Sequence, residues 1–361
     1  MTAEDSQTPL LATDGPLVTA DLPGIGGKLK ALPEDFVVEE IPAYEPSGDG
    51  EHLFLWIEKT GVAADELTRH LSRTLQTSPS ELGTAGLKDK LAVTRQFVSV
   101  PRRAEPLLSA IETDHIRLLN ATPHRHKLRT GHLRGNRFRV LVRDVADDDS
   151  LAKAQAIADQ LRRTGLPNYF GRQRFGHNLT TLRLGLDLLR QTASSRERQR
   201  SNRRFLHRLA LSAAQAWLFN QVLAERLQDG FLSRVFLGDV MQKCESGGLF
   251  EVRDVEAEQP RFDARETVLT GPMFGPKMRP TQHEPAAREQ RILAAAGLTM
   301  GAFRRFGQLA EGTRRPMLIW LDDLQVRATA EGLLFEFSLP SGAYATVVLR
   351  EFMKTDASES D

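Results

Sequence analysis

Residues 84–97, TAGLKDKLAVTRQF, hold one carboxylate between two lysines, at the point where a glycine-containing turn leads into a strand-like run. Asp89 in this setting has two interpretations. An acid in a turn commonly hydrogen-bonds the local backbone, and that needs no further role. It could instead be a working carboxylate, acting as a nucleophile or a general base. The residues of the stretch itself leave both interpretations open.

The loop that carries Asp89 is expected to lie between two regular elements. Leucines four residues apart predict a helix over residues 62–75. Ser78, Pro79 and Glu81 have the spacing of a capping box, which predicts a short second helix. RQFVSV then predicts a strand over residues 95–100. A loop held between a helix and a strand is a usual place for catalytic groups.

Alternating residues predict further strands on both sides of this loop. Residues 36–40 and 52–59 alternate and are separated by the turn-like EPSGDGE, which predicts a hairpin-like pair. Residues 137–143 also alternate, so that one face carries apolar side chains and the other a basic row. The apolar face consists of Phe138, Val140 and Val142, and the basic row of Arg137, Arg139 and Arg143.

Apolar residues at helical spacing predict long helices over residues 150–165, 205–227 and 284–296. Residues 263–271, DARETVLTG, and their acidic surroundings are expected to be irregular. Strand alternation returns over residues 315–340, around a turn at Ala330, Glu331 and Gly332, and a last helix is expected with Ser341 as its N-cap.

A strand-rich end that matches a strand-rich start predicts one main domain interrupted by an insertion. At 361 residues the chain is long enough for such an arrangement. The expected parts are a disordered N-terminal tail (1–20), the main domain (21–190 and 320–354), the inserted domain (191–319) and a disordered C-terminal tail (355–361).

Overall composition excludes several classes of protein. The 48 lysines and arginines nearly cancel the 47 acids, so the net charge of +1 does not reveal an anionic partner. A single cysteine, Cys244, excludes an internal disulfide and a multi-cysteine zinc site. The polar start has no features of a secretory signal, and no apolar run approaches the ~18 residues of a membrane span. We therefore expect a cytoplasmic protein that does not enter membranes.

The distribution of charge is more informative than its total. Residues 124–143 carry seven lysines and arginines and no acid, and a second basic run extends from Arg196 to Arg208. A single charge run is more often a solvated surface. Here both runs coexist with NYFGRQRF (168–175), in which rings alternate with arginines, and rings that stack on bases beside cations that hold phosphates favour an RNA partner.

The candidate RNA contacts are Lys88, Lys90, Arg125, Lys127, Arg129, Arg172 and Arg174. His124, His126 and His132 lie in the same basic stretch without a carboxylate neighbour, so nucleic-acid contact or plain surface is favoured over a metal site. PGIGGK (23–28) lacks the spacing of a phosphate-binding loop.

Five motifs in register resemble those of the tRNA pseudouridine synthase D family. They are LPEDFVVEE, AGLKDKLAVTRQF, PNYFGRQRFG, LSAAQAWLFNQVLAERL and LPSGAYATVVLREF, and the similarity extends from about Lys28 to Met353. The resemblance implies an α+β fold: a pseudouridine-synthase catalytic domain with a mixed, mainly antiparallel sheet and flanking helices, interrupted by an inserted α/β domain. It implies isomerisation of uridine 13 in the D arm of tRNA, with no cofactor and no metal.

The resemblance also implies roles for single residues. Asp89 matches the catalytic aspartate, Phe36 and Asn168 match residues that contact the target nucleotide, and Tyr344 falls where the family usually has phenylalanine. An ionised Asp89 in a pocket needs a cation beside it. Side chains adjacent to Asp89 in an extended segment point away from it, so we expect Lys30 to be that partner.

Three functions remain to be weighed. A tRNA pseudouridine synthase is favoured because Lys88, Asp89 and Asn168 are present together. An inactive RNA-binding or chaperone protein on the same scaffold is the alternative. An RNA methyltransferase is disfavoured because the chain lacks a glycine-rich cofactor loop. No obligate protein partner is evident from the sequence.

Overall fold

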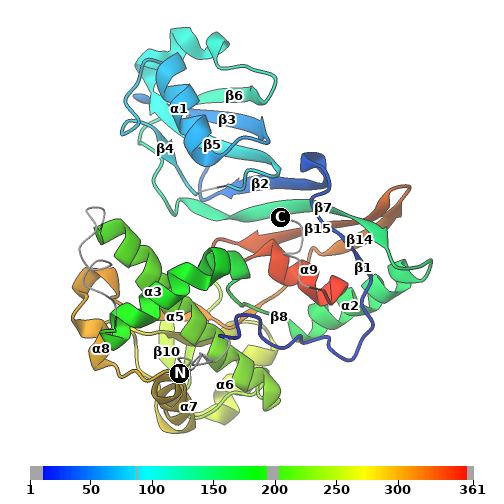
Figure 1. Ribbon diagram of the computed structural model, residues 1–361, viewed down its shortest axis with the longest axis vertical. Helices are drawn as coiled ribbons and strands as arrows, with labels where there is room; N and C mark the ends of the chain where they lie inside the picture. The colour runs from blue at the N-terminus through cyan, green and yellow to red at the C-terminus, as the bar shows by residue number, and fades with distance from the viewer. Residues whose placement is uncertain (1–10, 87, 193–202, 356–361) are drawn as a thin grey trace, which may run out of the picture. The chain divides into compact units, whose positions relative to one another are not determined.

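The computed structural model describes residues 11–86, 88–192 and 203–355, and the chain divides into two compact units (Figure 1). One unit contains Asp21–Gly165 and Trp320–Asp361 and is called the sheet unit below. The other contains Met1–Ala20 and Leu166–Ile319 and is called the helical unit. The contact division falls between residues 165 and 166 and between 319 and 320, and the predicted domain bounds stay a prediction.

The sheet unit is built on one large mixed sheet. Its central strand order is β14-β15-β7-β2-β5-β3-β6, with β1 paired to β7 and β4 paired to β5. Only the β2–β5 pair is parallel among the described strand pairs of this sheet, which makes it mainly antiparallel, as predicted. The strands are β1 (Gly26–Lys28), β2 (Phe36–Pro42), β3 (His52–Thr60), β4 (Gly83–Thr84), β5 (Val93–Pro101), β6 (Ile116–His124), β7 (Leu133–Val145), β14 (Gln325–Thr329) and β15 (Gly332–Pro340).

The predicted hairpin between β2 and β3 is wrong, because β5 lies between these two strands. Strand β5 pairs parallel with β2 and antiparallel with β3. The side chain of Glu40 in β2 also accepts a hydrogen bond from the Phe97 N–H of β5, at 3.0 Å. A turn-like connection fixes neither the partner nor the direction of the strand that follows it.

Helices cover the sheet at the positions that the apolar spacing indicated. They are α1 (Ala64–Thr74), α2 (Ser150–Thr164) and α9 (Ala345–Met353), with 3-10 helices η1 (Pro33–Asp35) and η2 (Arg102–Ala110). Helix α1 packs Leu67 and Leu71 against Leu53, Leu55 and Ile57 of β3, as its place across the sheet in Figure 1 indicates. Burying such side chains stabilises the fold by roughly 1.5–3 kcal/mol each.

Two predicted helix starts are wrong. Residues 78–82 form a turn: the Glu81 carboxylate accepts the Ser78 N–H at 2.9 Å, so the capping contact forms without a helix behind it. The last helix begins at Ala345 with Tyr344 as N-cap, instead of starting from Ser341.

The helical unit surrounds a smaller antiparallel sheet of order β10-β9-β11-β12, with a separate β8–β13 pair. Residues 267–273, expected to be partly irregular, form the interior strand β11, so that expectation is wrong. The elements of the helical unit are β8 (Leu166–Pro167), η3 (Arg172–Phe175), η4 (His177–Leu179), α3 (Thr180–Arg190), α5 (Arg203–Gln228), β9 (Val240–Lys243), β10 (Leu249–Glu251), α6 (Val255–Asp263), β11 (Thr267–Met273), α7 (His283–Ala295), α8 (Gly301–Arg304), η5 (Gly307–Leu309), β12 (Thr313–Pro316) and β13 (Leu318–Ile319).

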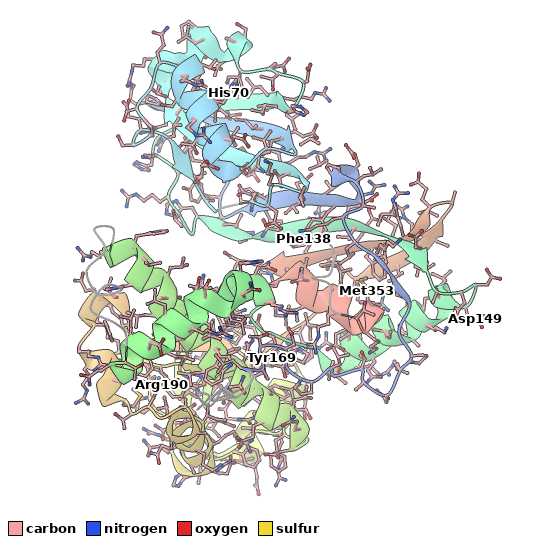
Figure 2. All side chains as sticks on the ribbon, in the orientation of Figure 1. His70, Phe138, Asp149, Tyr169, Arg190 and Met353 are labelled. Carbon is pink, nitrogen blue, oxygen red and sulfur yellow. The ribbon has the colours of Figure 1, made fainter. Side chains whose placement is uncertain are left out.

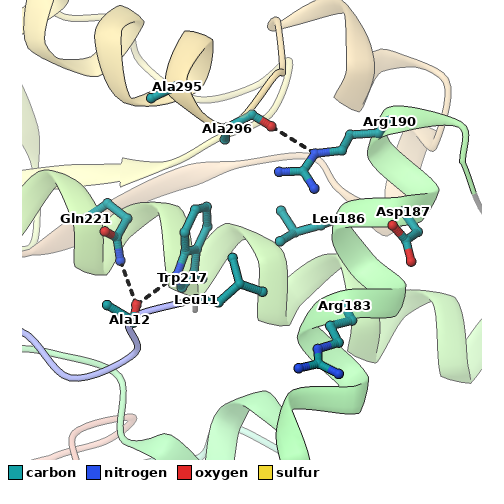
Figure 3. Close-up of a pocket in the computed structure, with 10 residues that line it drawn as sticks. All are labelled: Leu11, Ala12, Arg183, Leu186, Asp187, Arg190, Trp217, Gln221, Ala295 and Ala296. Atoms are coloured by element: carbon teal, nitrogen blue, oxygen red, sulfur yellow. Dashed lines mark hydrogen bonds between the residues drawn. The ribbon is translucent and has the colours of Figure 1, made fainter. Parts of the chain in front are cut away.

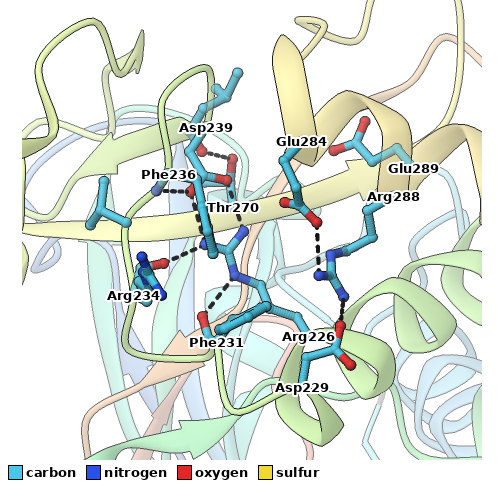
Figure 4. A network of polar contacts seen from close by, with 12 residues as sticks. Arg226, Asp229, Phe231, Arg234, Phe236, Asp239, Thr270, Glu284, Arg288 and Glu289 are labelled. Atoms are coloured by element: carbon cyan, nitrogen blue, oxygen red, sulfur yellow. Dashed lines mark hydrogen bonds and ion pairs between the residues drawn. The ribbon is translucent and has the colours of Figure 1, made fainter.

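Ion pairs made by buried arginines hold the helical unit together (Figure 4). Arg226 of α5 donates from both terminal nitrogens to Asp239, at 2.8 Å each, and both side chains are 2% exposed. Asp239 also accepts the Phe236 N–H at 2.8 Å. Arg288 of α7 pairs with Asp229 at the end of α5, at 2.7 Å. These pairs join α5 to the segment before β9 and to α7.

Residues 11–20, expected to be part of a disordered tail, are held on α5. The Ala12 carbonyl accepts from Trp217 Nε1 at 2.9 Å and from Gln221 Nε2 at 3.0 Å. Leu11 and Ala12 line a pocket of about 520 Å³ together with Trp217, Arg183 and Arg190 (Figure 3). Residues 1–10 and 356–361 lie outside the described residues. Within the described parts of the chain, no helix has the length and apolar character to cross a membrane.

Candidate active site around Asp89

Asp89 lies in the connection between β4 and β5 and is exposed over 55% of its side chain. Lys30 Nζ lies 3.3 Å from Asp89 Oδ2, and the Lys30 side chain is 23% exposed. The predicted pairing of Lys30 with Asp89 is therefore found in the structure. Lys30 has a φ of 55°, in the left-handed region that non-glycine residues seldom adopt, and such strain is often found at functional sites.

Phe36 lies on the other side of Lys30. The Lys30 ammonium is 4.6 Å from the centroid of the Phe36 ring, within range of a cation–π contact. Phe36 is 3% exposed and meets Phe138, which Figure 2 labels in β7, edge to face at 6.1 Å. The ring is thus a core residue that supports Lys30. Its predicted contact with a target base stays a prediction.

Asp35 fixes the short segment between Lys30 and Phe36. Its carboxylate accepts from Arg143 Nε and Nη2 at 2.8–3.0 Å and from the Leu32 N–H at 2.9 Å. Burial acts to raise the pKa of Asp35, but the hydrogen bonds from Arg143 and Leu32 outweigh it and the pKa is lowered. The acid of the PEDF motif therefore holds η1 in place, and Arg143 is not a free member of the basic row.

The side chain of Lys88 is buried, whereas a contact with RNA was predicted for it. Its ammonium lies 3.0 Å from Glu40 Oε1, donates to Asn136 Oδ1 at 2.6 Å, and its side chain is 6% exposed. Burial raises the pKa of Glu40, and the nearby Lys88 charge opposes that rise. Lys88 thus fastens its end of the loop to β2 and β7. The next lysine, Lys90, is exposed.

Lys59 in β3 is a residue of this site that our sequence reasoning missed. It is 0% exposed, and its ammonium donates to the Asp89 carbonyl at 2.9 Å and to the Val62 carbonyl at 2.7 Å. Burial lowers the pKa of Lys59 to about 8; the Asp89 charge opposes this and the Lys88 charge adds to it. The signal was present: Lys59 continues the row of Leu53, Leu55 and Ile57, where alternation demands an apolar residue.

Tyr344 is half-buried at the N-cap of α9, and its carbonyl accepts the Val347 N–H at 3.1 Å. Strand β15, which precedes it, runs antiparallel to β7 with Leu339 opposite Asn136. Asn136 is also the residue to which Lys88 donates. The Asp89 loop and the strand that leads to Tyr344 thus both meet β7 near Asn136.

Comparisons with known proteins decide the family. The family model described as "tRNA pseudouridine synthase D (TruD)" matches residues 14–197 and 199–352. The chain is 46% identical to the tRNA pseudouridine synthase D of Anaeromyxobacter sp. strain Fw109-5, over 96% of this chain and 97% of that protein. This chain belongs to the tRNA pseudouridine synthase D family.

Other relatives agree with this assignment. The chain is 42% identical to a tRNA pseudouridine synthase D of Thermus thermophilus, over 95% of this chain and 93% of that protein. It also shares the fold of a crystal structure of the putative tRNA pseudouridine synthase D from Methanosarcina mazei, with a TM-score of 0.78 and 24% identity, covering 97% of this chain and 99% of the other.

Asn168, a predicted substrate contact of this family member, is described within the helical unit. Its side-chain amide donates to the Pro316 carbonyl at 2.9 Å, and its side-chain oxygen accepts from Arg315 at 2.5 Å. Its backbone N–H donates to the Met317 carbonyl at 2.8 Å. These bonds hold PNYF against β12 and the start of β13, and only 5% of Asn168 is exposed.

The rings of the NYFGRQRF motif are core residues, although their alternation with arginines suggested stacking on bases. Tyr169, labelled in Figure 2, and Phe170 are both buried, and the Arg315 guanidinium lies 4.0 Å from the Phe170 ring centroid. Asn220 of α5 bonds to both the N–H and the carbonyl of Phe170. Arg174 donates to Ser212, which makes it a brace of this loop, whereas Arg172 is exposed.

The basic stretch 124–143 is partly neutralised by contacts within the chain. Arg125 pairs with Asp49 at 3.0 Å, Lys127 donates to the Ser80 carbonyl, and Arg129 is exposed. The predicted alternation of β7 is confirmed, because Phe138, Val140 and Val142 are buried while Arg137 and Arg139 are exposed.

Two of the three histidines in this stretch belong to an aromatic cluster around Tyr44. His124 is buried, stacks on Tyr44 with centroids 5.2 Å apart, and accepts the Ser47 N–H at 3.1 Å. His132 Nδ1 lies 2.6 Å from the Tyr44 hydroxyl. Burial lowers the pKa of His124. The expected surface role of His124 is therefore wrong, and the described residues contain no cluster of three metal-ligating side chains.

Proposed function

We propose that this chain is a tRNA pseudouridine synthase that isomerises uridine 13 in the D arm of tRNA, with Asp89 as its catalytic carboxylate. The observation that supports this most is the setting of Asp89 itself. Its side chain is exposed and has Lys30 at 3.3 Å, whereas its backbone is anchored by a buried lysine. A carboxylate presented in this way is suited to act on a substrate that approaches from solvent.

The sheet unit is the catalytic domain in this proposal. It contains Asp89, Lys30, Phe36 and Tyr344, whereas the helical unit contains the whole predicted insertion and the Asn168 loop. We assign 21–165 and 320–354 to catalysis and retain 191–319 as the insertion. Residues 166–190 carry the Asn168 motif within the helical unit.

The reaction conserves the atoms of the nucleotide apart from protons exchanged with solvent. The bond between N1 of uracil and C1′ of the ribose breaks, the base rotates while it is held, and C5 bonds to C1′. The C5 proton then leaves and N1 carries a proton in the product. Asp89 either attacks the ribose as a nucleophile or removes a ribose proton as a base, and both routes are open.

The target base must leave the stack to reach Asp89. Tyr344 is the aromatic group that would stack on the extruded uracil, and its hydroxyl adds a hydrogen-bonding group to the edge of the pocket. Lys90, Arg125, Lys127, Arg129 and Arg172 would hold phosphates. The side-chain amide and oxygen of Asn168 are already bonded within the helical unit, so its contact with the target nucleotide stays a prediction. Lys30 balances the charge of Asp89 from within hydrogen-bond range.

Tritium release from C5-labelled uridine in tRNA tests the proposal, comparing wild type, Asp89→Asn and Asp65→Asn. Asp65 is a matched control because it is an exposed acid in an ion pair, here with Arg69 on α1. We expect Asp89→Asn to lose at least about 10²–10⁴-fold in rate and Asp65→Asn to behave as wild type. Equal release by all three proteins would remove Asp89 from the chemistry. No release by wild type that still binds tRNA would favour the inactive RNA-binding protein.

A further inference from the structure

Lys59 occupies a position that strand geometry reserves for an apolar side chain. It lies on the face of β3 that also presents Leu53, Leu55 and Ile57. Its strand partners are Thr94 of β5, which is buried, and Ile116 of β6, which is also buried. A methionine would fill much of the same volume without a charge. Packing alone therefore does not require an ammonium at this position.

The Lys59 ammonium donates its hydrogen bonds to two backbone carbonyls. Its acceptors are Asp89 O at 2.9 Å and Val62 O at 2.7 Å, and both are neutral dipoles. Burying a charge is costly unless it is hydrogen-bonded and compensated. The charged side chains that act on Lys59 both come from the Asp89 loop, namely Asp89, whose charge favours the ammonium, and Lys88, whose charge disfavours it.

We propose that Lys59 is a positioning residue for the reaction of Asp89: its buried ammonium fixes the Asp89 backbone and supplies positive charge beneath the carboxylate. This inference rests on the proposed function of Asp89. Lys59 has no exposed surface with which to touch a substrate, so it acts only through the loop above it.

A second anchor restrains the same loop from the preceding residue. Lys88 is held by Glu40 at 3.0 Å and by Asn136 at 2.6 Å. Lys88 and Asp89 are thus each tied down by a buried contact, one through a side chain and the other through a carbonyl. The side chain of Asp89 is left to pair with Lys30 alone among these three lysines. A nucleophile or base held in this manner loses little entropy on reaching its reactive position.

The test compares single-turnover rates and tRNA affinity for wild type, Lys59→Met, Lys59→Gln and Leu55→Ala. Leu55 is the matched control, because it is a fully buried residue on the same face of the same strand. We expect Lys59→Met to lower the rate by about 10–100-fold while tRNA affinity changes by less than about 3-fold. Lys59→Gln is expected to fall between, since it keeps a donor and loses the charge. Leu55→Ala, which lowers stability, should keep the wild-type rate wherever it is folded.

The outcomes separate this inference from the proposed function. A folded Lys59→Met with the wild-type rate, or with a loss confined to tRNA affinity, would overturn the positioning role while leaving Asp89 in place. Failure of the proposed function is seen differently, as an inactive wild type or a fully active Asp89→Asn.

A second measurement starts from the wild-type protein. Because the pKa of Lys59 is about 8, the wild-type rate should decline from about pH 7 to about pH 9.5 as the ammonium loses its proton, with tRNA affinity unchanged. A rate that stays constant over this range would overturn the proposal. The decline should be absent from whichever Lys59 variant folds, which assigns it to Lys59.

Discussion

Two buried cations, one in each unit, show how differently this chain holds a charge in its interior. Arg226 in the helical unit is met by Asp239 through two bonds of 2.8 Å, and both side chains are equally buried (Figure 4). Lys59 in the sheet unit is fully buried as well, but its ammonium bonds only to carbonyl oxygens among the described residues. The carboxylate that balances it electrostatically, Asp89, is more than half exposed.

The Arg226–Asp239 pair therefore contributes to the stability of the fold, whereas the charge of Lys59 acts on the candidate site. Arg226 and Asp239 satisfy each other, so the pair has no unbalanced charge to offer beyond the interior. The field of Lys59 is instead directed at a loop whose acid faces solvent. A buried cation bonded to carbonyls and lying beneath an exposed acid is therefore a physical signature of positioning, and it can be tested against the buried pair.

Breaking the Arg226 pair should have the largest effect on stability. Arg226→Met leaves the Asp239 carboxylate buried without its partner, and we expect the free energy of unfolding to fall by about 3–5 kcal/mol. Urea unfolding followed by circular dichroism measures it. Arg226→Met combined with Asp239→Leu should recover part of the loss, since no buried charge remains, although the Phe236 N–H then lacks its acceptor. A single variant as stable as wild type would refute the structural role of the pair.

The buried charge of Lys59 should change the free energy of unfolding by a smaller amount, and by an amount that depends on pH. The pKa of Lys59 is about 8 in the folded chain and near its ordinary value of 10.5 when unfolded. Between these values the unfolded state binds more protons, so stability contributed at this site rises with pH, by up to about 3 kcal/mol in total. The penalty of burying the charge is complete below pH 8 and is relieved towards 10.5.

Subtracting the stability of Lys59→Met from that of wild type at each pH isolates this term. The subtraction cancels groups such as Cys244 and Tyr44, whose pKa values are both raised by burial and which titrate in the same alkaline range. A difference that is independent of pH would show that Lys59 is not buried as a charge.

The comparison also explains what sequence reasoning could and could not find at the site. Lys30 was predicted to pair with Asp89 because neighbouring side chains of an extended segment diverge, and this local rule held. Lys59 was overlooked because its partner is a backbone carbonyl of a loop thirty positions away, which no side-chain pattern encodes. The break in the apolar row of β3 was visible, but it has meaning only when the strand is known to be covered on that face.

The fold divides in the same way between local and distant causes. Helix α5 and the alternation of β7 follow from periodicity within one segment, and both were predicted. The position of β5 between β2 and β3 depends on pairing between distant segments, which turn composition does not determine. The interpretation of Tyr169 and Phe170 as stacking rings was wrong for another reason. Rings among arginines suit both a stacked base and a core that packs against guanidinium groups. Both rings are buried and the Arg315 guanidinium lies over Phe170, so they form such a core.

The smallest expected effects concern three cations of the basic stretch 124–143. Replacing Arg125, Lys127 and Arg129 with glutamine should weaken tRNA binding and reduce the slope of log affinity against log salt by about 0.7–0.9 for each phosphate that is no longer neutralised. Arg69→Gln is the control, because Arg69 is also exposed and paired with an acid. An unchanged slope in the triple variant would mean that residues 125–129 do not face RNA.

Asp49 allows the opposite change on the same surface. Its hydrogen bonds with Arg125 lower the pKa of Asp49, so at neutral pH it is ionised and competes with phosphate for that arginine. Asp49→Asn should therefore strengthen tRNA binding only slightly, because an exposed ion pair contributes little. Binding weakened by this variant would indicate that Asp49 orients Arg125 towards RNA. In that event Arg125 would be a cation that Asp49 holds in position for contact with RNA.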